Sequence, residues 1–289
     1  MPIRYLSGVS VRAKNAEALL TSSHESLPYS DFAMLDPEVP SSVTAAMLDL
    51  QHCICRGYRF YVTGIVPLEK VQAMVQRFAE RYELSAGKDR RHYLRKSGIA
   101  RFDLVLFPRP GETAFQFWLL KTEGDDPLAS LERWRDAHAD YLPWIWRYEL
   151  VRLPVPVGLQ KRYRKPLEDP REARRTQRIR PVTWTWRITA QAMDTIRARI
   201  RSAVQRPDAE LEQLLHGLKT TPGFRGNRDQ LRQLFYYIVE QSKRAGRPVP
   251  ALPKTIRWVR PMQVARVPLS AIVRRHRRGA PTWFAGHKP

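Results

Sequence analysis

The feature that most constrains the fold is the order of apolar patterns between residues 57 and 156. Four segments are dense in β-branched and aromatic residues or alternate in polarity, which is typical of strands. These segments are residues 57–66, 99–107, 113–121 and 146–155. Helices are predicted after Pro67 and from Asp126, because apolar residues recur there with helical spacing. The order strand, helix, strand, strand, helix, strand predicts an α+β fold of the ferredoxin-like (βαββαβ) type.

The flanking regions have a different character. Residues 1–56 form an N-terminal extension with Ser-rich and Pro-rich stretches and one short helical candidate at 42–54. Residues 157–289 are basic and predicted to be mostly helical, and the polar segment 87–98 is predicted to be a loop. The sequence therefore predicts three parts: the extension, a ferredoxin-like domain over 57–156, and a basic helical nucleic-acid-binding region over 157–289.

The charge of the chain is concentrated in its second half. Residues 1–150 contain 19 Lys and Arg and 19 Asp and Glu, whereas residues 151–289 contain 31 basic and nine acidic residues and carry the whole net charge of +22. A neutral half joined to a strongly basic half is typical of a scaffold that carries a polyanion-binding surface. An acidic protein partner is the alternative.

Arginines dominate the basic half. The segment 169–180 (DPREARRTQRIR) spaces four of its five arginines to share one helix face, and a second group follows on a predicted helix. These arginines are Arg171, Arg174, Arg175, Arg178 and Arg180, then Arg197, Arg199 and Arg201. Because a guanidinium binds phosphate through two parallel hydrogen bonds, we interpret them as a nucleic-acid surface. A merely solvated helix face is the alternative.

The segment 220–230 (TTPGFRGNRDQ) places Arg225 and Arg228 at a predicted helix start. Free N–H groups and the helix dipole favour anions there, so both arginines are candidate nucleic-acid contacts. A simple helix-entry turn explains the segment equally well.

A possible catalytic group lies in the predicted loop at 87–98. Metal-independent RNA cleavage needs a base, an acid and a cation near the phosphorane, and His92, Tyr93 and Arg95 supply these types of group. A plain surface histidine is the alternative for His92.

Other functional classes leave no signal. There is no apolar run near 18 residues, no GxSxG or HExxH motif, and no zinc-ligand spacing around Cys53 and Cys55, the two cysteines of the chain. We predict no cofactor, no metal and no membrane partner, and the small number of cysteines favours the cytoplasm.

The predicted ferredoxin-like domain, followed by the arginine-rich segments DPREARRTQRIR and TIRARIRSAVQR, resembles CRISPR-associated proteins that process and bind crRNA. In architecture the chain is most similar to the endonuclease of type IV systems, which has an arginine-rich helical finger. The resemblance implies an antiviral-defence protein that binds a structured guide-RNA repeat, cleaves it without metal, and stays in a ribonucleoprotein effector complex with protein subunits. The alternatives are a non-catalytic DNA-binding accessory protein of a plasmid or integrative element and a subunit that docks on an acidic protein.

Overall fold

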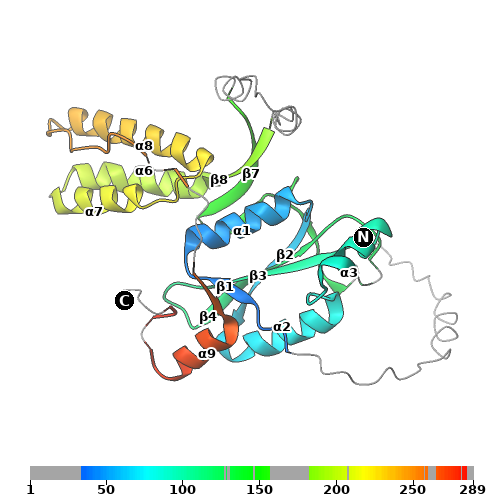
Figure 1. Cartoon of the computed structure of the whole chain (residues 1–289). Coiled ribbons are helices and arrows are strands. Elements are labelled where there is room, and N and C mark those ends of the chain that lie inside the picture. The colour runs from blue at the N-terminus through cyan, green and yellow to red at the C-terminus, as the bar shows by residue number, and fades with distance from the viewer. Residues whose placement is uncertain are drawn as a thin grey trace, which may run out of the picture. The chain divides into compact units, whose positions relative to one another are not determined.

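A computed structural model of the chain describes residues 34–126, 128, 131–145, 147–156, 182–206, 208–256, 258–259, 265–280 and 282–284 (Figure 1). The helices in this part of the chain are α1 (Val43–Cys55), α2 (Leu68–Tyr82), α3 (Lys88–Lys96), α6 (Ala190–Val204), α7 (Asp208–Lys219), α8 (Arg225–Arg244) and α9 (Leu269–Arg277). The strands are β1 (Glu38–Pro40), β2 (Phe60–Pro67), β3 (Phe102–Pro108), β4 (Ala114–Lys121), β5 (Arg135–Asp136), β6 (Leu142–Trp144), β7 (Tyr148–Pro154), β8 (Val182–Ile188) and β9 (Arg266–Pro268). The architecture is α+β, as the sequence predicted.

The larger sheet is antiparallel and has the strand order β3-β4-β2-β5. β3 and β4 form a hairpin, and β2 lies on the other side of β4. Successive residues of β4 point to opposite faces. Phe117 packs edge-on against Phe78 of α2, whereas Trp118 points to the other face and stacks on Trp144 at a centroid distance of 4.8 Å.

The predicted ferredoxin-like strand order is not confirmed. Its fourth strand forms as β7, but β7 pairs with β6 and β8 in a separate three-stranded sheet instead of joining β2. The pairing places Leu150 opposite Trp186, and both side chains are completely buried. The favoured partner of β7 is therefore a strand that lies beyond residue 156, the predicted domain boundary.

The predicted helix from Asp126 is also not formed by the described residues of 126–138, which contain β5 instead. The Asp126 carboxylate accepts a hydrogen bond from the Leu128 backbone N–H at 2.9 Å and pairs with Lys121 at 3.0 Å. At the other end, Arg59 holds the Asp136 carboxylate and β5 pairs with β2. The local partners of Asp126 and the long-range partner of Asp136 thus outweigh the helical pattern.

Three tryptophans connect the two sheets. Trp118 of β4 stacks on Trp144 of β6, and Trp144 meets Trp186 of β8 edge-on at 6.3 Å. The first and last rings of this series also have hydrogen-bond acceptors. Trp118 Nε1 donates to Pro143 O, and Trp186 Nε1 donates to Met47 O of α1. Buried indoles need such partners, so this chain of rings fixes α1 and both sheets around one core.

The remaining elements close the same core. β1 pairs with β9, and Arg266 of β9 forms an ion pair with Asp49 of α1 at 2.7 Å. The described part of the predicted N-terminal extension is therefore joined to the end of the chain. Helix α6 packs on α7 and on the long helix α8, and α8 also packs on β8 (Figure 1).

Candidate nucleic-acid interface

The segment predicted as a basic loop is in fact the helix α3. It begins after Gly87 and carries Asp89 in its first turn and Arg95 with Lys96 in its last, which is the charge order that the helix dipole favours. Arg90 binds Glu83 through two hydrogen bonds of 2.9 and 3.0 Å and so fastens the start of α3 to the residue that ends α2. The prediction failed because α3 has almost no apolar pattern.

One face of α3 is basic along its whole length. Lys88, Arg91, His92 and Arg95 follow the i, i+3, i+4, i+7 spacing that places side chains on the same side of a helix. With Arg101, they line a cleft of about 680 Å³. We refer to this site as the α3 cleft; its other lining residues are Ala86 and Asp89.

Most cations of the α3 cleft have no acidic partner within the described ranges of the chain. Arg91 is the exception, because it donates to Ala86 O and Leu84 O and lies 3.9 Å from Asp103. In the part of the chain that the structure describes, the side chains of Lys88, His92 and Arg95 form no hydrogen bond or ion pair and are exposed.

The fifth basic side chain of the cleft comes from the segment that leads into β3. The Arg101 guanidinium lies 5.7 Å from the centre of the Tyr58 ring, a contact that leaves its N–H groups available to an anion. Among the described residues that line the cleft, Asp89 is the one acidic residue. The cleft therefore has the charge and the donors to bind phosphate.

The structure brings together two of the three predicted catalytic residues. His92 and Arg95 both line the α3 cleft, whereas Tyr93 does not line it and has its ring 5.4 Å from the Arg90 guanidinium. Lys88, Arg91 and Arg101 were not predicted as site residues from the sequence. The helical spacing of basic residues from 88 to 95 was the signal for the first two, but Arg101 has no such signal because a turn separates it from α3.

The other predicted arginines do not form one surface in the described residues. Arg171, Arg174, Arg175, Arg178 and Arg180 lie outside the described residues. On α6, Arg197 is 3.4 Å from Asp194, Arg201 donates to the Tyr237 hydroxyl at 3.1 Å, and Arg199 lines a separate cleft of about 490 Å³ with Arg147. The α6 arginines thus point in different directions.

Protein atoms contact both arginines that were predicted at the start of α8. Arg225 donates to the carbonyl oxygens of Leu153 and Pro154 and to the Thr183 hydroxyl, and burial lowers its pKa. Arg228 is buried beneath the ring of Trp258. These contacts give Arg225 a structural role and leave little of Arg228 for direct contact with phosphate.

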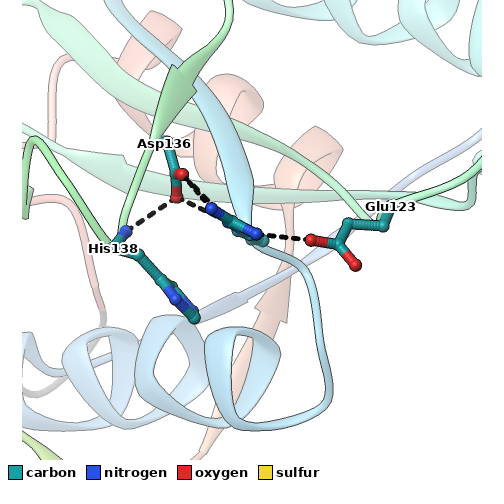
Figure 2. A network of polar contacts seen from close by, with 4 residues as sticks. Glu123, Asp136 and His138 are labelled. Carbon is teal, nitrogen blue, oxygen red and sulfur yellow. Dashed lines mark hydrogen bonds and ion pairs between the residues drawn. The ribbon is translucent and has the colours of Figure 1, made fainter.

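A second polar cluster joins the strands instead of opening into a cleft. Arg59 donates from Nε to both oxygens of Asp136 at 2.9 Å and from Nη1 to Glu123, and the His138 backbone N–H donates to Asp136 at 2.8 Å. Figure 2 shows Glu123, Asp136 and His138 in this network. Burial, followed by the nearby charge of Arg59, lowers the pKa of His138. The carboxylates of this cluster are already occupied by one guanidinium.

Comparisons of the chain with protein-family models, with curated proteins and with solved structures found no match. Among the described helices, none combines the length and the apolar character that crossing a membrane requires. The described residues also contain no group of three or more His, Cys, Asp and Glu side chains placed to hold a metal ion.

Proposed function

We propose that the chain is a cytoplasmic RNA-binding protein that holds the phosphates of a structured RNA in the α3 cleft. The observation that carries the proposal is the set of cations on one helix face, of which Lys88 and Arg95 have no hydrogen-bond or ion-pair partner among the described residues. Four like charges around one cleft repel one another, and a polyanion relieves this repulsion.

The shape of RNA fits this arrangement. An A-form helix offers its phosphates and 2′-hydroxyls on the surface, and its deep major groove is closed to side chains. Recognition of a stem therefore depends on shape and backbone charge, which short, basic helices supply. The predicted arginine-rich segment at 169–180 would extend the same kind of contact.

The specific form of the proposal is processing of a guide-RNA repeat. In this scheme His92 takes the proton of a 2′-hydroxyl, the 2′-oxygen bonds to phosphorus, and the bond from phosphorus to the 5′-oxygen breaks. The imidazolium returns the proton to the 5′-oxygen through water, while Lys88 and Arg95 neutralise the charge on the phosphorane. The products carry a 2′,3′-cyclic phosphate and a 5′-hydroxyl, and the bound fragment stays in the cleft as part of a ribonucleoprotein complex.

Purification at low salt tests the ligand class. Nucleic acid extracted from the protein should be degraded by RNase and resist DNase, and a structured RNA stem should compete better than duplex DNA of equal length. Degradation by DNase alone supports the DNA-binding accessory protein instead. A preparation with little absorbance at 260 nm even at low salt supports docking on an acidic protein.

Cleavage has a separate test. His92→Ala should abolish the formation of uniform RNA ends but retain binding, since Lys88 and Arg95 remain. The matched control is His216→Ala, because His216 is an exposed histidine on α7 that does not line the α3 cleft. Unchanged cleavage in the His92 variant removes His92 from the mechanism and leaves the binding proposal intact.

A further inference from the structure

A tryptophan on the surface is stacked on a buried arginine. The Trp258 side chain is 56% exposed, yet its ring centre lies only 3.3 Å from the guanidinium carbon of Arg228. Next to it, the Val259 backbone N–H donates to Gly223 O at 3.2 Å and anchors this segment to the loop before α8. One face of the indole is thus covered by a cation, and the large exposed fraction leaves the other available to a ligand.

The arginine beneath is an unusual buried cation. Arg228 is 8% exposed, and in the described part of the chain its side chain forms no hydrogen bond or ion pair, so that its buried Nε lacks a partner. It also lies near the N-terminus of α8, the positive end of the helix dipole. Burying an unpaired charge is costly, and burial, then the charge of Arg232, lowers its pKa. The contact with Trp258 and the nearby charge of Asp229 stabilise the charged form of Arg228.

Further cationic and aromatic side chains follow Arg228 along α8. Arg232 is one helical turn away and exposed, and Tyr236, one turn further, is 83% exposed. Arg232 pairs with Asp229 at 2.6 Å, but the two side chains are 58% and 50% exposed. A phosphate can therefore replace the carboxylate at little cost. Aromatic rings alternating with arginines are typical of surfaces that bind single-stranded nucleic acid.

We propose that Trp258, supported by Arg228, is a base-stacking site for single-stranded RNA. A nucleobase stacks on the outer face of the indole, and Arg232 contacts the adjoining phosphate. Stacking on an aromatic ring tolerates any base, so this site adds affinity without sequence preference. The inference rests on the proposed function in that the ligand is RNA. The α3 cleft binds phosphates, whereas this second site binds a base.

Fluorescence anisotropy with a short uridine oligonucleotide tests the site. Trp258→Ala should weaken binding by about 5- to 150-fold, the equivalent of about 1–3 kcal/mol for one stacked base, whereas Trp258→Phe should retain most of the affinity. The matched control is Leu131→Ala, which removes an apolar side chain of similar exposure, 52%, and should bind as the unaltered protein does. An abasic ribose-phosphate oligomer of equal length should bind Trp258→Ala and the unaltered protein equally.

A second readout does not depend on the variant's fold. In the unaltered protein, an oligonucleotide with 2-aminopurine should lose fluorescence on binding, because stacking on an indole quenches it. Unchanged affinity in Trp258→Ala, or 2-aminopurine that stays bright when bound, overturns the inference. Such a result leaves the proposed function standing if loss of Lys88 and Arg95 still lowers the salt dependence of binding. If Trp258→Ala weakens binding and the α3 variants change nothing, the stacking site stands and the α3 cleft proposal fails.

Discussion

Removing two cations of the α3 cleft, Lys88 and Arg95, should change how strongly salt weakens RNA binding. The double variant Lys88→Gln with Arg95→Gln deletes two charges from one helix face. Both side chains are exposed and make no hydrogen bond or ion pair in the described residues, so the fold and its stability should be unaffected. The variant therefore isolates the electrostatic contribution of the cleft.

The size of the effect follows from counterion release. Each phosphate that a cation neutralises contributes about 0.7 to the slope of log K against log salt for a single strand and about 0.9 for a duplex. Two lost contacts should reduce the slope by about 1.4–1.8. Between 50 and 200 mM salt, the unaltered protein should thus lose about 7- to 12-fold more affinity than the variant does.

Anisotropy titrations of an RNA stem at four or more salt concentrations measure the slope. The control is Lys70→Gln with Lys219→Gln, which removes the same charge from exposed positions on α2 and α7 that do not line the cleft. If the two double variants reduce the slope equally, binding reflects the net charge of the chain and the reasoning about the cleft is refuted.

Three further predictions concern the fold that supports these sites. Gly226→Ala should destabilise the protein by about 1–3 kcal/mol in urea unfolding, because its Cβ would lie 2.5 Å from Trp186 O; the control Gly217→Ala, with no atom within 4 Å, should stabilise it by about 0.5–1 kcal/mol. Asp126→Asn should cost about 3–5 kcal/mol in the same assay, since it leaves a buried lysine without its carboxylate. Burial, then the charge of Glu132, raises the pKa of Tyr82 to about 12. The folded state therefore holds this proton where the unfolded chain has lost it, and stability should fall as pH rises from about 10 to 12. Thermal melts of Tyr82→Phe should lack this part of the decline.

Each of these predictions has a contradicting result. Equal urea-unfolding midpoints for Gly226→Ala and Gly217→Ala would show that α8 moves away from β8 without a cost in free energy. A stable Asp126→Asn protein would mean that the lysine reaches solvent or loses its proton. If the melting temperatures of Tyr82→Phe and the unaltered protein fall equally as pH rises above 10, the phenol is in contact with water in the folded state.

Local patterns in the sequence predicted the elements that depend on neighbouring residues. The helical spacing of apolar residues after Pro67 and the strand patterns at 99–107 and 113–121 predicted α2, β3 and β4 close to their observed bounds.

Apart from α3, which lacks an apolar pattern, the failures involve partners that are distant in the chain. A strand pattern does not reveal which edge it joins, so β7 was assigned to the wrong sheet although it was predicted as a strand. Asp136 reads as an ordinary polar residue of a helix until Arg59 is placed beside it. The arginines at the start of α8 look like free cations in the sequence, and only the fold shows that one binds carbonyl oxygens and the other lies beneath an indole.

Photo-crosslinking tests the central claim most directly. RNA bound to the full chain is irradiated, the protein is digested, and the peptides that carry a nucleotide are identified by mass spectrometry. Binding in the α3 cleft predicts adducts between residues 86 and 101, lost at high salt and reduced in Lys88→Gln with Arg95→Gln. Adducts confined to other segments, with none between residues 86 and 101, would contradict it.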